Sequence, residues 1–148
     1  MDLKAIMMGG VLPSILLGTS TVLMKFSFKK GISLSAYITV VGGTVLLYGL
    51  TAMLINGKGA LNAVSTTYAV GMGVLWSSAM LCICYGFSVL RLPVALVAPL
   101  TNSNALVAVL LSALLLSEWK DLNFYKVIMG TVLIVMGASI VSTAIASE

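Results

Sequence analysis

The stretch LCICYGFSVLRLPVALVAPL, residues 81–100, decides how often this chain crosses a membrane. Arg91 is the only charged residue between Gly59 and Ser117. One helix over that whole run would be about 88 Å long, whereas the hydrocarbon core of a bilayer is about 30 Å thick. Pro93 has no backbone N–H to donate, and it disfavours helical geometry at the residue before it. The chain is therefore predicted to turn here, which makes the two flanking segments antiparallel neighbouring helices.

The remaining charges divide the rest of the chain into segments of similar length. Of its 148 residues, 60% are hydrophobic and only 8% are charged, against about 25% charged residues in soluble domains. An ionised side chain at mid-membrane costs about 2.5–3.5 kcal/mol, so each long charge-free block is predicted to be a transmembrane helix. Five such blocks occur: Ala5–Met24, Gly31–Gly57, Gly59–Leu90, Leu92–Ser117 and Val127–Ser147.

These blocks predict an all-α membrane protein built as a five-transmembrane-helix bundle. The expected spans are about 5–27, 32–55, 66–90, 94–116 and 124–146, in a single domain over residues 1–148. An outer-membrane barrel is excluded because its strands alternate apolar and polar residues, and Val107–Leu116 does not alternate. We expect the first block to be a span, since Met24-Lys25-Phe26 is a poor cleavage site for a signal peptide.

The composition argues against a catalytic or metal centre inside the membrane. The chain has no histidine, and its four carboxylates are expected outside the spans: Asp2, Glu118, Asp121 and Glu148. The two cysteines, Cys82 and Cys84, point to different faces of a helix and cannot form a disulfide with each other. We therefore expect no enzymatic activity, no cofactor and no buried metal site.

Lys and Arg residues in short loops normally decide which side of a membrane protein is cytoplasmic. With the N-terminus inside, the cytoplasmic set is Lys4, Lys58, Lys120 and Lys126; with it outside, the set is Lys25, Lys29, Lys30 and Arg91. The two sets are equal, and two alternatives stay open. Either clustered charge fixes one orientation, or the protein inserts both ways and pairs as an antiparallel, dual-topology homodimer, as inverted repeats do within many transporters. We expect a dimer in both cases, and a paired partner chain is a further alternative.

Polar side chains inside the spans are the candidates for a substrate site. Asn102 and Asn104 lie near the middle of the fourth block, where amide side chains need partners. Pro13 and Pro99 are expected to bend their helices. The predicted substrate-binding residues are Asn102, Asn104, Tyr48, Trp76, Ser14 and Lys25. The alternative for Lys25 is plain helix packing, with its ammonium reaching the membrane interface.

Three motifs resemble one transporter family. Arg91-Leu92-Pro93-Val94-Ala95-Leu96-Val97-Ala98-Pro99-Leu100 resembles the junction between the third and fourth helices of the EamA-like drug/metabolite transporters. Leu114-Leu115-Leu116-Ser117-Glu118 is similar to a second motif, although that family usually has Gly before the Glu. Gly130 and Gly137 match its glycine-spaced last helix, where they are expected to form a close-packing seam. Most members have ten helices in two inverted halves, so the resemblance implies a single EamA-type unit.

The resemblance also bears on the transport mechanism. The related small multidrug resistance proteins carry a membrane-embedded Glu eight residues before a Lys, and here Leu17 stands at that position before Lys25. Proton-coupled export of cations by that carboxylate is therefore not expected. We expect a multi-pass protein of the inner (plasma) membrane that transports a small polar or zwitterionic metabolite by alternating access as a dimer. The alternatives are a non-transporting interaction subunit and a carrier of a lipid-linked substrate.

Overall fold

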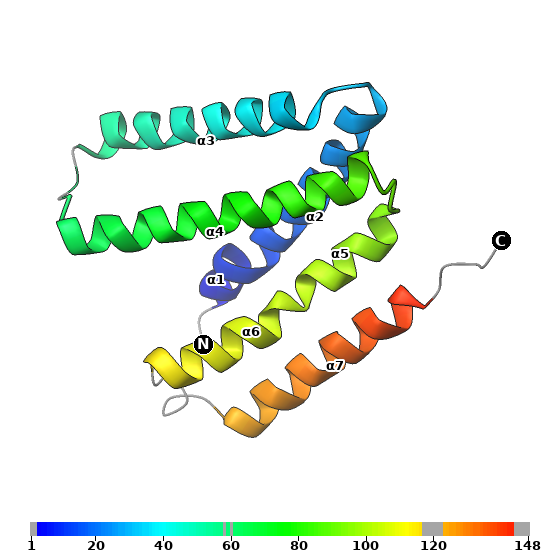
Figure 1. Ribbon diagram of the computed structural model, residues 1–148. Coiled ribbons are helices and arrows are strands. Elements are labelled where there is room, and N and C mark those ends of the chain that lie inside the picture. Colours follow the sequence, from blue (N-terminus) through cyan, green and yellow to red (C-terminus); the bar gives the residue numbers. More distant parts are fainter. Residues whose placement is uncertain (1–2, 58, 60, 117–122, 144–148) are drawn as a thin grey trace. The chain divides into compact units, whose positions relative to one another are not determined.

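The computed structural model describes residues 3–57, 59, 61–116 and 123–143, which form helices and turns without strands (Figure 1). Five helical segments are long and apolar enough to cross a membrane, as the charge spacing predicts: Met7–Lys29, Leu34–Asn56, Ala63–Ser88, Val94–Leu116 and Tyr125–Ser142. Among the predicted bounds that fall on described residues, the largest difference is at the third span, expected from residue 66 and found from Ala63. The predicted end at 146, all four carboxylates and residues 117–118 of the second motif lie outside the described residues.

The chain divides into two compact units, Met1–Arg91 (unit 1) and Leu92–Glu148 (unit 2). Unit 1 contains α1 (Leu3–Ile6), the π-helical turn η1 (Met7–Val11), α2 (Leu12–Lys29), α3 (Leu34–Asn56) and α4 (Ala63–Ser88). Unit 2 contains α5 (Val94–Asn102), α6 (Asn104–Leu111), the π-helical turn η2 (Ser112–Leu116) and α7 (Phe124–Ser142).

The first span changes its helical geometry just before Pro13. The π-helical turn η1 precedes Pro13, which occupies the first turn of α2. Proline cannot donate the backbone hydrogen bond that a continuous α-helix requires at that position, and π-helical turns are one way in which a helix absorbs such a defect. The helical geometry therefore changes just before Pro13, and the bend expected at this proline stays a prediction.

The end of α2 is a Schellman motif that follows directly from the sequence Lys29-Lys30-Gly31. The backbone N–H of Gly31 donates to the Phe28 carbonyl at 3.0 Å, and that of Ile32 donates to the Ser27 carbonyl at 3.4 Å. Gly31 has φ +90°, a left-handed conformation that glycine adopts without a steric penalty. The motif stops α2 at Lys29 and redirects the chain into α3.

Hydroxyl side chains inside the spans bond to their own helices. Thr44 and Thr51 each donate to the backbone carbonyl four residues earlier, at 2.9 and 2.8 Å. The same local bond occurs at Ser14, Thr19, Thr21, Thr39, Thr67, Ser78, Thr131 and Ser139. These bonds satisfy the hydroxyl protons within each helix, so the presence of these residues does not by itself require a polar cavity.

The core of unit 1 lies where the C-terminal parts of α2 and α4 meet. Met24 of α2 is 4% exposed, and Cys84 and Phe87 of α4 are 0% and 3% exposed. The Cys84 thiol lies 4.0 Å from the Met24 sulfur, and the Phe28 and Tyr37 rings are 5.0 Å apart between centroids. Figure 1 shows α4 running beside α3 and meeting α2 near this end. The two cysteines are unpaired, as predicted, with Cys82 exposed and Cys84 buried.

In unit 2, α5 and α6 both pack against α7. The helix breaks at Ser103, four residues after Pro99, where the backbone N–H of Ser103 donates to the Leu100 carbonyl at 3.2 Å. The buried residues of α7 are Thr131 and Ala138, one heptad apart. A Cβ at Gly130 or Gly137 would meet nothing within 4 Å, so these glycines make no close approach inside unit 2, and the packing seam expected there stays a prediction.

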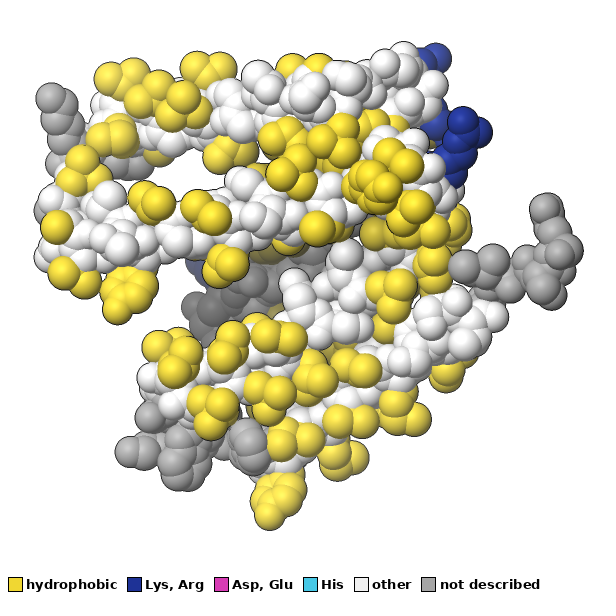
Figure 2. Space-filling model, in the orientation of Figure 1, with side chains coloured by type: hydrophobic (Ala, Val, Ile, Leu, Met, Phe, Trp, Pro, Cys, Tyr) yellow, Lys and Arg dark blue, Asp and Glu magenta, His cyan; other side chains and the backbone are white. Residues whose placement is uncertain are grey.

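The surface of the described residues is dominated by apolar side chains. Large hydrophobic residues are exposed along every span, for example Leu54 at 85% and Tyr68 at 77%, and Figure 2 shows their yellow side chains across the visible face. Such a surface is unfavourable in water and favourable against lipid. Together with the five long apolar helices, it identifies a multi-pass membrane protein.

Candidate functional site

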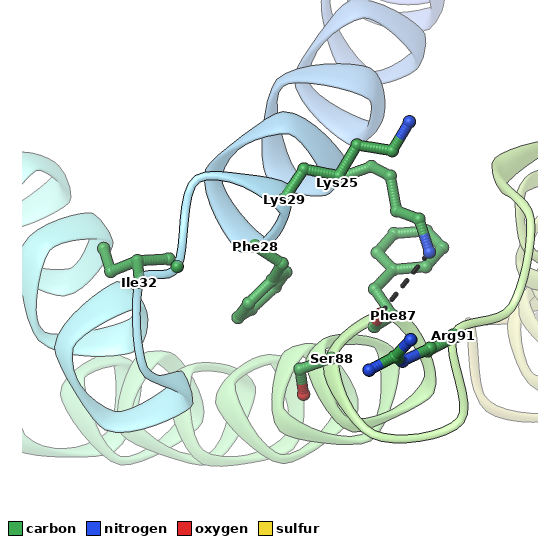
Figure 3. A pocket seen from close by; sticks show the side chains of 8 residues that line it. Lys25, Phe28, Lys29, Ile32, Phe87, Ser88 and Arg91 are labelled. Atoms are coloured by element: carbon green, nitrogen blue, oxygen red, sulfur yellow. Dashed lines mark hydrogen bonds between the residues drawn. The ribbon is translucent and has the colours of Figure 1, made fainter.

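A cavity of about 540 Å³ lies in unit 1, where α2 and α4 end (Figure 3). We call it the basic pocket, because its charged lining residues are Lys25, Lys29 and Arg91. The other lining residues are the aromatic Phe28 and Phe87 together with Gly31, Ile32 and Ser88. None of these is acidic, and the sequence contains no Asp or Glu from residue 3 to residue 117. The basic pocket therefore carries a concentrated positive charge.

Lys25 reaches from α2 toward the end of α4. Its ammonium lies 5.1 Å from the centroid of the Phe87 ring and donates to the Phe87 carbonyl oxygen at 3.4 Å (Figure 3). The first contact is a cation–π interaction. The second is longer than the usual 2.7–3.2 Å or so of an N–H···O hydrogen bond and correspondingly weak. Both partners are neutral, so these contacts leave the formal charge of Lys25 in place.

Arg91 follows α4 and has φ +55°, the only positive φ among the non-glycine residues described. A left-handed conformation brings the Cβ too close to the following carbonyl oxygen and costs about 1–2 kcal/mol in a residue other than glycine. Backbone strain of this kind concentrates at functional sites. Here it places an exposed guanidinium beside Ser88 and Phe87 (Figure 3). The unfavourable backbone conformation after α4 thus occurs at Arg91, a residue that lines the basic pocket.

The helix ends account for part of this arrangement. Cations near a helix C-terminus interact favourably with its last carbonyl groups, and Lys25 bonds to such a carbonyl at the end of α4. Lys29 lies in the last turn of α2. Neutralising two helix ends does not require a cavity, however, and the basic pocket combines its cations with a volume in the usual range for small ligands, about 300–1,000 Å³.

Of the six predicted substrate-binding residues, Lys25 alone lines the basic pocket. Ser14, Tyr48 and Trp76 lie in the same unit, on α2, α3 and α4, with exposed side chains. Asn102 and Asn104 belong to unit 2, where they are exposed on either side of the break at Ser103. Ser14, Tyr48 and Trp76 are not among the residues that line the basic pocket, and the role of all five residues in substrate binding stays a prediction.

Sequence reasoning did not identify the rest of the basic pocket. Its signal was present in the charge count, because Lys25, Lys29 and Arg91 all belong to the set that falls on one side of the membrane. In unit 1 these three residues line the same cavity. Figure 2 shows dark-blue Lys and Arg side chains gathered at the corresponding end of the unit.

No protein-family model, curated protein or solved structure matches this chain.

Proposed function

We propose that this protein is a membrane transporter of the drug/metabolite type that moves a small polar metabolite, anionic or zwitterionic, by alternating access as a dimer. The observation that carries the proposal is the basic pocket. It is a cavity of about 540 Å³ with three cationic lining residues, in a chain with five long apolar spans. A transporter needs a binding site that opens to water, and a cavity of this size at the ends of two spans supports that role.

The dimer is part of the same proposal. Alternating access needs two halves that rock around a shared site, and the resemblance to EamA-like transporters implies that five spans make one half. Two copies would supply ten spans. We propose that Ser14, Tyr48, Trp76, Asn102 and Asn104 contribute to substrate binding in addition to Lys25.

Two observations favour the alternatives. The basic pocket lies at the ends of two spans, which is the depth of lipid headgroups, and this position suits a carrier of a lipid-linked substrate. Gly130 and Gly137 leave an open face on α7. Small residues let a second helix approach closely, and such a face suits an interaction subunit that transports nothing by itself.

Reconstitution into liposomes tests the proposal. Purified protein, with its helical content verified by circular dichroism, is reconstituted, and the uptake of radiolabelled serine (a zwitterion) and glycerol 3-phosphate (an anion) is followed. We expect saturable uptake of at least one probe, loss of that uptake in Lys25→Gln/Arg91→Gly, and normal uptake in Lys126→Arg, which keeps the positive charge at a residue that does not line the basic pocket. Folded wild-type protein that takes up neither probe faster than protein-free liposomes would contradict the proposal and favour the interaction subunit.

A further inference from the structure

The net charge of the basic pocket indicates the kind of ligand it takes. Lys25, Lys29 and Arg91 give its lining a formal charge of +3. Two helix C-termini, those of α2 and α4, lie at the pocket, and each contributes a charge equivalent to about −0.5. The sum is about +2. A phosphate monoester carries about −1.5 to −2 at pH 7, whereas a carboxylate carries only one negative charge. We infer that the basic pocket binds a phosphate monoester.

The donors available in the basic pocket agree with this assignment. The Arg91 guanidinium offers a planar pair of N–H groups that matches two phosphate oxygens, and the Lys25 ammonium adds a point charge from a different helix (Figure 3). The Ser88 hydroxyl already donates to the Cys84 carbonyl at 2.7 Å. The Gly31 backbone N–H is likewise engaged, with the Phe28 carbonyl at 3.0 Å. Recognition of an anion therefore depends on the cationic side chains.

Lys29 has a different place from the other two cations. Its side chain is exposed, and in Figure 3 it extends from the end of α2 away from Arg91. The long, flexible stem of a lysine lets its ammonium approach a bound anion without a change in the backbone. We assign Lys25 and Arg91 to direct contact with the phosphate and Lys29 to the rim of the basic pocket.

At the depth of the basic pocket, the phosphate group could belong either to a lipid headgroup or to a soluble phosphate ester. The lining residues lie at the ends of the spans Met7–Lys29 and Ala63–Ser88, where lipid headgroups and soluble phosphate esters both reach. The Phe28 and Phe87 rings add an apolar wall that suits the carbon skeleton of either ligand. The inference rests on the proposed function in taking the basic pocket as the substrate site, but binding itself requires no transport.

Isothermal titration of the full chain in detergent micelles tests the assignment and separates the sources. The soluble probe is glycerol 3-phosphate, with acetate as its carboxylate control. The lipid probe is dioctanoyl phosphatidate, with dioctanoylglycerol as its phosphate-free control. We expect each phosphate to bind about tenfold or more tightly than its control. If phosphatidate binds about tenfold more tightly than glycerol 3-phosphate, the natural ligand is a lipid headgroup; if the two affinities are similar, it is a soluble phosphate ester.

Two results of this titration would overturn the inference. One is the absence of phosphate binding above the controls, and the other is acetate binding as tightly as glycerol 3-phosphate. The liposome assay separates this inference from the proposed function. Phosphate binding without flux of any probe refutes transport and leaves the phosphate site standing. Flux of serine without phosphate binding refutes the phosphate site and leaves transport standing.

Charge variants show whether the binding occurs in the basic pocket. Lys25→Gln and Arg91→Gly should each lower the affinity for phosphate about tenfold, because each removes one charge-assisted hydrogen-bond donor. Arg91→Gly guards against misfolding, since glycine adopts the positive φ of this position without a penalty. Lys126→Gln, on α7 and not a lining residue, should bind as the wild type does. If the cations only stabilise helix ends, the pocket variants unfold more easily and keep their affinity, which would overturn the inference.

Discussion

Replacing Arg91 with glycine or with alanine should separate the effect of its charge from the effect of its backbone. Both variants remove the guanidinium, but only glycine relieves the left-handed conformation at φ +55°. That conformation costs about 1–2 kcal/mol for a residue with a Cβ. Glycine also lowers the stability by about 0.4–1 kcal/mol, because it increases the conformational entropy of the unfolded chain. Taking the middle of each range, Arg91→Gly should be more stable than Arg91→Ala by about 0.8 kcal/mol.

Comparison with the wild type completes the prediction. Loss of the cation beyond the C-terminus of α4 costs about 0.3–1 kcal/mol, and this cost applies to both variants. Arg91→Ala should therefore unfold more easily than the wild type, and Arg91→Gly should be close to it. Equilibrium unfolding of the purified protein in mixed detergent–SDS micelles, followed by circular dichroism, measures the difference. Alanine proving equal to or more stable than glycine would refute the claim that the backbone at Arg91 is strained.

Three further perturbations test other parts of the structure. Cys84→Leu should lower the unfolding free energy by about 1–3 kcal/mol because the residue is fully buried. Cys82→Leu, at an exposed position, is the control and should change the unfolding free energy by less than about 0.5 kcal/mol. Equal effects of the two substitutions in SDS unfolding would contradict the packing of α2 on α4. Gly137→Leu should leave the helical fold intact, since nothing lies within 4 Å of an added Cβ, but weaken a dimer formed through this glycine face about tenfold. A dimer fraction unchanged in analytical ultracentrifugation would show that the face is not the interface. Asn102→Ala combined with Asn104→Ala should lower transport in liposomes about tenfold with little loss of stability, because both side chains are exposed, and unchanged flux would remove both residues from the substrate site.

The five helices could be predicted from the sequence because the cost of placing a charge inside a membrane is large. The limited thickness of a bilayer and the geometry of Pro93 predict the turn after Arg91, where Pro93 precedes the first residue of α5. The break in the fourth span was not placed correctly by proline alone. Pro99 remains inside α5, and the helix is interrupted at Ser103, whose backbone N–H bonds three residues back. The position of a proline therefore predicts which part of a helix is interrupted, but not the residue at which the interruption occurs.

The basic pocket could not be predicted for a different reason. Lys25 and Phe87 are 62 residues apart, and their meeting depends on which faces of α2 and α4 pack together. In a soluble protein an amphipathic pattern shows the buried face. Here most sides of each span are apolar, and helix association in a membrane depends on close packing rather than on removal of apolar surface from water. The contact between Met24 and Cys84 that brings the two helices together is therefore invisible to hydropathy.

The equal division of positive charge makes orientation sensitive to single residues, and this sensitivity is the strongest test of the antiparallel dimer. Lys30 and Lys126 are exposed, belong to opposite charge sets, and do not line the basic pocket. By the positive-inside rule, Lys30→Gln should shift the population toward an inside N-terminus, which places the C-terminus of a five-span protein outside. Lys126→Gln should shift it the other way.

Reporter fusions at the C-terminus measure this balance in a bacterial host. Alkaline phosphatase is active only on the periplasmic side of the membrane, and green fluorescent protein fluoresces only on the cytoplasmic side. Dual topology predicts both signals in the wild type, more phosphatase activity in Lys30→Gln and more fluorescence in Lys126→Gln. A single signal that neither substitution changes would mean that the basic pockets of all copies face one side of the membrane. The antiparallel homodimer would then be wrong, and the second half of the transporter would have to come from a parallel copy or from a different chain.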